Sequence, residues 1–385
     1  MKSDVSAVQL NERRKVSYTQ GVLIAVILMI ASKVCTLPSV LAGVAGSKAV
    51  WSVLILVTIE IAILFFSFKT AKCGGVPALP LKRGVKLPIL LFFTLFFTLK
   101  LTCLTREIAT YFALSLFDNA PVLPITILLL VACALIAAKG FMAIGRLSEI
   151  FLWLFAFVFL FVVIFTRTEG DLFNALGIFS PDIAGMGDGV VKGMGWFGDS
   201  AILSFLDLRG ETRFSPHAKG VPVPPVRTQA KRRIAFAALL FASLTVVLFF
   251  AVFIASYGDA AKMTDYAFIK LSAFKANTDE LGSADWPVII LWSVVSCLYL
   301  ALLFLSGEWC IREIARKEKG KAAPYHFLLG SAAVLIGLLA LDEEKIYESF
   351  MTNVMNILTF LAAGAAVGPG IYALTRKGEC YEKAN

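Results

Sequence analysis

The chain has few charged residues and few histidines for its length, and both shortages limit what it can be. Only 16% of its 385 residues are Asp, Glu, Lys or Arg, whereas 58% are hydrophobic and the mean hydropathy is +0.81. Soluble domains carry about 25% charged residues, so the composition excludes that class and indicates a membrane protein. Two histidines and seven scattered cysteines, with no Cys-x-x-Cys pair, argue against a zinc site and a disulfide framework.

Patterns that carry catalysis are missing as well. We find no nucleophile–base arrangement, phosphate loop or metal cluster, so we expect no enzyme activity, no catalytic residues, no cofactor and no metal site. The net charge of +9 could suit nucleic acid, but the aromatic residues lie in apolar runs and not among the Lys and Arg. Basic cytoplasmic loops explain the excess better, and we expect no nucleic-acid partner.

Long hydrophobic runs are abundant. A bilayer core of about 30 Å needs about 20 apolar residues per helix, which predicts an all-α polytopic membrane protein with about ten transmembrane helices. The predicted spans are residues 18–45, 50–68, 87–116, 122–138, 142–165, 186–206, 234–257, 287–305, 325–341 and 350–374. The sixth span is rich in glycine and only weakly hydrophobic.

Lys and Arg alternate between the two sides of this scheme. They are dense in residues 1–17, in the tail 375–385 and in the loops after the even-numbered spans. The other side holds only Lys48, Arg167, Lys262, Lys270, Lys275 and Lys345. The positive-inside rule therefore places both termini in the cytoplasm, and adding or removing one span would destroy the alternation.

Two loops have a distinct composition. The basic, proline-rich cytoplasmic loop 209–233 is predicted to be extended and solvated. The outer loop 258–286 contains TDYAFIKLSAFK, whose apolar spacing predicts a short surface helix over the outer mouth. An ordinary interfacial helix with no gating role is the equal alternative.

The first and sixth spans are interrupted. The first contains ASKVCTLPS, where Pro38 removes a backbone donor, and the sixth contains GMGDGVVKGMGWFGDS with six glycines. Non-helical backbone at membrane depth persists only where it lines a cavity or is buried in protein. Two interruptions five spans apart indicate an inverted-repeat transporter core, with residues 18–165 and 186–374 as the repeats of one integral membrane domain. The alternatives are a simple kink at Pro38 and a glycine-rich packing helix or loop at the sixth span.

Four segments, in order, resemble a known family. They are ASKVCTLPSVLAGVAGSKAVW, TREIATYFALSLFDNAPVLPI, AAKGFMAIGRLSEIFLWLF and DLFNALGIFSPDIAGMGDGVVKGMGWFGDSAILSFL. Together they resemble the B-subunit family of spore germinant receptors, within the amino acid–polyamine–organocation (APC) transporter superfamily. The resemblance implies a ten-helix, LeuT-like fold with 5+5 inverted repeats. It also implies a place in the spore inner membrane beside an A subunit and a lipoprotein C subunit, where nutrients such as amino acids are sensed.

The two interruptions supply the candidate ligand-binding residues. Half-helix N-termini suit a carboxylate and freed carbonyls suit an ammonium, so a small zwitterion such as an amino acid fits both. The candidates are Ser32, Lys33, Cys35, Thr36, Gly193, Gly195, Trp196, Phe197 and Gly198. We expect backbone amides and Thr36 to hold the carboxylate, with Trp196 and Phe197 covering the ligand side chain. The alternative for Trp196 is a packing or lipid-facing aromatic.

Charged residues in or beside apolar runs form a second set of candidates. They are Lys33, Glu60, Lys100, Arg106, Glu107, Lys192 and Asp199. A charge in hydrocarbon costs several kcal/mol, so such residues usually face a partner or a water-filled pathway. All except Lys192 are predicted coupling or ion-pair residues, and a structural ion-pair network is the alternative.

Specific roles follow for some of these charges. We hypothesise that Lys33 replaces a coupling cation, which favours a sensor or proton-linked carrier over a sodium symporter. The alternatives are a side chain that snorkels to the interface and an ion pair with Glu60. Lys100 with Glu107, or Glu60 with a cation of another helix, are the predicted buried pairs. Asp199 is a candidate proton site. Ser293, Ser296 and Tyr299 offer hydroxyls on the eighth span, although serines commonly bond to their own helix.

Three functions remain open at this point. The first is a nutrient-sensing receptor subunit with A and C partners, and the second is an amino-acid permease, with proton coupling as one form of it. The third is a membrane scaffold that has lost ligand binding. All three place the chain among lipids, in the cell membrane or the spore inner membrane.

Overall fold

The computed structural model describes residues 16–115, 120–165, 177, 183–208, 225–264, 266–273, 285–315, 323–340 and 343–375, and the regular elements within them are helices. Nearly all of the predicted cytoplasmic ends 1–17 and 375–385 lies outside these residues, as do loop residues 209–224 and 274–284. Helical residues occur in each of the ten predicted spans.

The predicted first span is two helices joined by a break. Helix α2 (Tyr18–Ile30) begins with a capping box, in which the Ser17 hydroxyl accepts from the Gln20 amide at 3.2 Å. Winding stops after Ile30 and resumes in α3 (Leu37–Ala45). Pro38 lies in the first turn of α3, where its missing N–H costs no helical hydrogen bond. It therefore starts the second half-helix, and the simple-kink alternative is wrong.

The predicted sixth span is also interrupted. Helix α9 (Ile183–Gly193) continues into the short 3₁₀ element η4 (Met194–Trp196), and a second 3₁₀ element, η5 (Asp199–Phe205), follows. Between η4 and η5, Phe197 is extended and Gly198 has φ +83°, a left-handed conformation that favours glycine. The alternative of a continuous glycine-rich helix is therefore wrong for this span.

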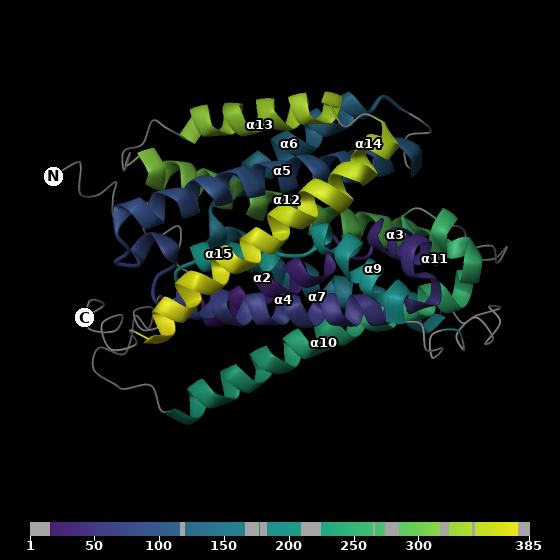
Figure 1. Ribbon diagram of the computed structural model, residues 1–385, viewed down its shortest axis with the longest axis horizontal. Helices are drawn as coiled ribbons and strands as arrows, with labels where there is room; N and C mark the ends of the chain where they lie inside the picture. Colours follow the sequence, from purple (N-terminus) through teal and green to yellow (C-terminus); the bar gives the residue numbers. More distant parts are fainter. Residues whose placement is uncertain are drawn as a thin grey trace.

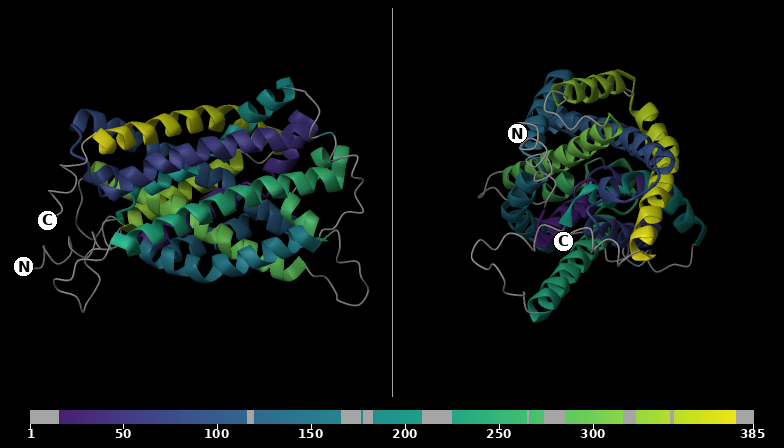
Figure 2. Two further views of the ribbon diagram at one scale, coloured as in Figure 1. Left: turned by 90° about the horizontal axis from the view of Figure 1, so that it is seen from below. Right: turned by 90° about the vertical axis from the view of Figure 1, so that its left-hand side faces the viewer.

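Longer helices enclose the two interrupted spans. They are α4 (Ala49–Lys72), α5 (Arg83–Ser115), α6 (Val122–Ala138), α7 (Phe141–Phe165), α10 (Pro225–Tyr257), α12 (Asp285–Ala315), α13 (Ala323–Ala340) and α15 (Asn356–Thr375). Helix α12 packs along α5 and also contacts α6 and α7, while η5 and α15 pack on α4. In Figure 1, α13 and α10 lie at opposite edges of the bundle, with α2 and α9 between them. The end-on view of Figure 2 shows the same arrangement.

Five stretches of the described chain are long and apolar enough to cross a bilayer on their own. They are Leu37–Lys72, Arg83–Leu114, Phe236–Met263, Ile289–Ala315 and Lys345–Thr375. Helices α6 and α7 pass the same test as a pair bent by 110°, which gives up to six spans by length and composition. Helix α2 is apolar but has only 13 residues, because the break ends it early.

The predictions for loops 209–233 and 258–286 have different outcomes. Helix α10 begins at Pro225, so the last part of the loop predicted to be extended is helical instead, with proline at a first position that suits its fixed φ. In the outer loop, the predicted short helix is confirmed as α11 (Ala267–Ala273). Its first amides donate to the first break, from Ala267 to the Cys35 carbonyl at 3.0 Å and from Phe268 to the Val34 carbonyl at 3.1 Å.

Candidate functional site

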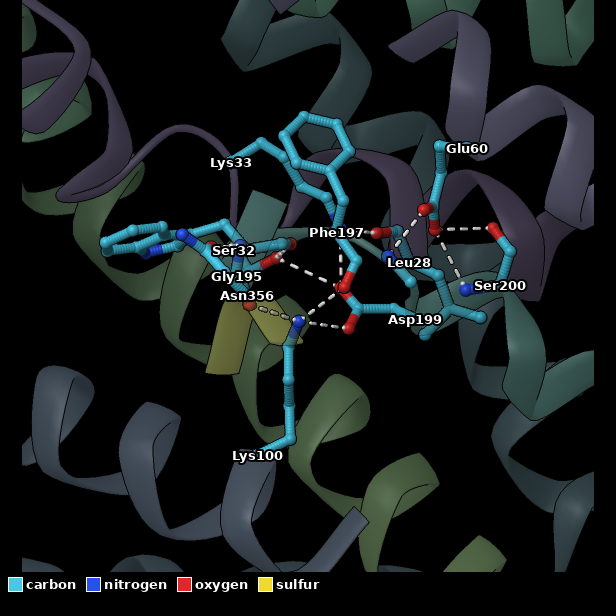
Figure 3. Close-up of polar contacts among 12 residues, drawn as sticks. Leu28, Ser32, Lys33, Glu60, Lys100, Gly195, Phe197, Asp199, Ser200 and Asn356 are labelled. Carbon is cyan, nitrogen blue, oxygen red and sulfur yellow. Dashed lines mark hydrogen bonds and ion pairs between the residues drawn. The ribbon is translucent and has the colours of Figure 1, made fainter. Parts of the chain in front are cut away.

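The two breaks are joined by one buried carboxylate. Asp199 follows the sixth-span break, and its Oδ2 lies 2.5 Å from the Lys33 ammonium in the first break. Its Oδ1 lies 2.8 Å from the ammonium of Lys100, which comes from the middle of α5. All three side chains are 0% exposed. Figure 3 shows both lysine side chains directed at Asp199. We call Lys33, Asp199 and Lys100 the lysine–aspartate triad.

Both ammonium groups also bind backbone carbonyls that the breaks leave free. Lys100 donates to the carbonyls of Gly195 at 2.8 Å and Phe197 at 2.7 Å. Lys33 donates to the Leu28 carbonyl in the last turn of α2 at 2.6 Å, and its Nζ lies 5.3 Å from the Phe197 ring centroid. A buried charge is tolerated when it is paired and hydrogen-bonded, and each ammonium of the triad meets that condition.

A second carboxylate binds the amides that begin η5. Glu60, on α4, is 0% exposed. It accepts from the amides of Gly198 at 2.6 Å and Ser200 at 2.9 Å, and from the Ser200 hydroxyl at 2.6 Å. These amides have no helical acceptor of their own, so the carboxylate satisfies buried donors at the start of a helical segment.

A third carboxylate binds the start of α3. Glu107, on α5, accepts from the Thr36 amide at 3.1 Å and the Thr36 hydroxyl at 2.6 Å. The Tyr347 hydroxyl donates to its other oxygen at 3.2 Å. The Arg106 guanidinium lies 4.4 Å from the Tyr347 ring centroid, and the Trp196 indole N–H donates to the Thr36 hydroxyl at 3.3 Å. Trp196 therefore connects the Glu107 cluster to the sixth-span break.

These contacts correct the predicted ion pairs. Lys33 pairs with Asp199 and not with Glu60, and Lys100 pairs with Asp199 and not with Glu107 seven residues along its own helix. The amides and the Thr36 hydroxyl that were expected to hold a ligand carboxylate bind Glu60 and Glu107 instead. These polar groups of the two breaks are thus satisfied by the chain itself.

The remaining predicted site residues lie around the same centre. The Ser32 hydroxyl lies 3.3 Å from Asp199 Oδ2, and Cys35 is buried with its carbonyl bonded to α11. Trp196 and Phe197 are each 1% exposed, so Trp196 does not face lipid. Gly193 packs against leucines of α3 and α4. Lys192, another charge of the predicted sixth span, is exposed on α9.

Two of the hydroxyl residues predicted on the eighth span lie in different surroundings. Tyr299 brings its buried hydroxyl to the triad, beside Asp199 and Ser32. Ser293 bonds to its own helix, through the Ile289 carbonyl at 2.6 Å. The hydroxyl of Tyr299 therefore lies at the junction of the breaks, whereas that of Ser293 is used within α12.

Sequence reasoning missed two polar residues of the last span. Asn356 accepts from the Gly195 amide through Oδ1 and donates to the Thr352 carbonyl, directly after the π-helical segment Phe350–Met355. Tyr347 binds Glu107 from the short helix α14 (Glu344–Ser349). A lone Asn in the apolar run VMNILTF was the available signal, and π-helical segments occur frequently at functional sites.

Gly195→Ala should destabilise the sixth-span break by about 2 kcal/mol. A Cβ at this position would lie 2.4 Å from the Met351 backbone carbonyl, which can move only with its helix. Gly187→Ala, in the same span, is the matched control because a Cβ there meets nothing within 4 Å. Thermal unfolding of the two purified variants measures the difference, and equal Tm values would contradict the close packing of the π-helical segment Phe350–Met355 on the break.

The triad is a poor site for a divalent metal. The described residues include no group of three or more His, Cys, Asp or Glu side chains that could hold a metal ion. The one carboxylate at the centre already lies between two ammonium groups, which would repel an incoming metal cation.

No known protein family and no curated protein matches the chain by sequence. The fold, in contrast, is similar to that of a manganese transporter from Eremococcus coleocola. Its complex with an aromatic bis-isothiourea substituted compound has a TM-score of 0.55 at 15% identity, and a mutant of it has a TM-score of 0.56 at 14% identity. Each comparison covers 91% of this chain and 77% of the transporter chain. The protein thus has the fold of a membrane transporter and is an integral membrane protein.

Proposed function

We propose that this chain is a transporter-fold, nutrient-sensing subunit of a spore germinant receptor that binds an amino-acid-like ligand where its two breaks meet. The fold similarity and the four segments that resemble the germinant-receptor B subunits support this proposal. The receptor would include A and C subunits in the spore inner membrane. The chain would have ten helices in two inverted repeats, residues 18–165 and 186–374, with both termini cytoplasmic.

The observation that carries the proposal is the shared carboxylate of Asp199 between two lysines. A zwitterionic ligand offers a carboxylate that can pair with Lys33 or Lys100 and an ammonium that can pair with Asp199. Such a ligand replaces an internal ion pair with equivalent pairs of its own, so the exchange leaves no buried charge unpaired. The two breaks would then be released from each other, and a ligand that prefers this released state shifts the protein toward it.

The same exchange supports a permease as the second candidate. The transporter fold favours it, because a ligand that enters between the breaks from one side could leave toward the other. Substrate-dependent uptake into sealed vesicles of the purified chain would establish the permease. Ligand binding without uptake would favour the sensor.

A panel of amino acids should reveal ligand binding as a rise in Tm of the purified chain. We expect a small subset of the panel to raise Tm by about 3 °C or more, and Trp196→Ala to abolish this shift while Trp196→Phe keeps part of it. Trp153→Ala is the control, because Trp153 is 74% exposed on α7 and should leave the ligand shift unchanged. If the Trp196→Ala protein kept the full ligand-induced rise in Tm, the ligand would not bind at the junction of the breaks.

A further inference from the structure

Three oxygens of the sixth-span break converge on one point. They are the carbonyl oxygens of Gly195 and Phe197 and the Oδ1 of Asp199, and they lie 2.8, 2.7 and 2.8 Å from the Lys100 Nζ. All three come from residues 195–199, which run from the end of η4 through the unwound pair Phe197 and Gly198 to the start of η5. The ammonium reaches them from another helix, α5 (Figure 3). We call these oxygens the carbonyl–carboxylate cradle.

The chemistry of the cradle is that of a monovalent-cation site. Backbone carbonyl and carboxylate oxygens replace the hydration shell of a dissolved cation in membrane proteins, and unwound helix segments provide them. We propose that the carbonyl–carboxylate cradle is a monovalent-cation site that Lys100 fills with its own ammonium. The chain therefore needs no dissolved alkali cation to hold this break, and removing the lysine side chain opens the site to Na⁺ or K⁺.

Lys33 does not occupy an equivalent site. Its ammonium has one carbonyl partner, that of Leu28, together with Asp199 Oδ2 and the face of the Phe197 ring. The role of a substitute cation, which the sequence suggested for Lys33, thus falls to Lys100. With Lys100 removed, Asp199 and Lys33 balance each other in charge. The two freed carbonyls and Oδ1 then face a space that a cation of one charge can fill.

The test is ligand-free thermal unfolding of the full chain in NaCl, KCl or N-methyl-D-glucamine chloride at constant ionic strength. The wild-type Tm should be the same in all three salts. Lys100→Ala should have a lowered Tm in the glucamine salt, and Na⁺ or K⁺ should raise it saturably by about 3 °C or more. Lys100→Met is the matched control, because its unbranched apolar side chain fills the same space without charge and should show no alkali-specific rise.

Three results would overturn the proposal. One is an alkali-specific rise in the wild-type Tm, which would mean that Lys100 leaves the cation site open. The second is a Lys100→Ala protein whose Tm responds equally to glucamine and alkali salts. The third is a Lys100→Met protein whose Tm rises in alkali salts as much as that of Lys100→Ala. Should Lys100→Ala fail to fold, Lys100→Ser, whose hydroxyl can join the cation's ligands, is judged by the same criteria. No organic ligand is present, so the outcome is independent of the proposed amino-acid sensing.

Discussion

Asp199→Asn should lower the free energy of unfolding by about 3–5 kcal/mol, the largest effect that we expect from one substitution in this chain. The carboxylate is 0% exposed and is the anionic partner of both Lys33 and Lys100. An asparagine keeps the shape but leaves two buried ammonium groups without a counter-charge. Thermal unfolding followed by tryptophan fluorescence, with size-exclusion recovery after heating, measures the loss.

Two comparisons isolate the charge at this position. Asp188→Asn removes the same charge from an exposed site on α9 and should leave the Tm unchanged. Combining Asp199→Asn with Lys100→Met removes one of the two unpaired ammonium groups. The double variant should therefore lose less free energy of unfolding than the sum of the losses in the two single variants. Strict additivity of the two losses would contradict the pairing of Lys100 with Asp199.

Glu60→Gln should cost about 3 kcal/mol, because hydrogen bonds to a charged acceptor contribute about 1.5–3 kcal/mol each and several are altered. The carboxylate accepts from two amides and a hydroxyl at the start of η5. A glutamine must turn its NH₂ group toward one of these donors, which leaves a buried donor without an acceptor.

The matched control for Glu60 is Glu149→Gln on α7, where the side chain is exposed. Hydrogen exchange of the Gly198 and Ser200 amides adds a local measurement, since both should exchange faster in Glu60→Gln and not in Glu149→Gln. Unchanged exchange at these two amides would show that Glu60 does not hold the start of η5.

Much of the fold follows from residues that act locally. Pro38 starts the second half-helix of the first break, and Gly198 adopts the left-handed conformation of the second, so both interruptions are visible in the sequence. The burial of six charged residues follows from the apolar runs around them, and all six are at most 9% exposed. The amphipathic spacing in the outer loop likewise predicts α11 correctly.

The partners of the buried charges do not follow from the sequence. Spacing along one helix places Lys100 and Glu107 on related faces, but it does not say which other helix presents a carboxylate to either of them. Asp199 reaches both lysines only because α5 and the two breaks pack together. Asn356 is missed for the same reason, since its contact with Gly195 depends on how α15 lies against the break.

The most direct measurement is an electron cryomicroscopy map of the full chain in lipid nanodiscs, at a resolution that shows side chains. We predict helical winding that stops between Ile30 and Leu37 and again at Phe197 and Gly198, with density for both lysine side chains reaching Asp199. Continuous winding through either segment, or an Asp199 side chain without a lysine on each side, would contradict a junction of two broken helices held by the chain's own charges.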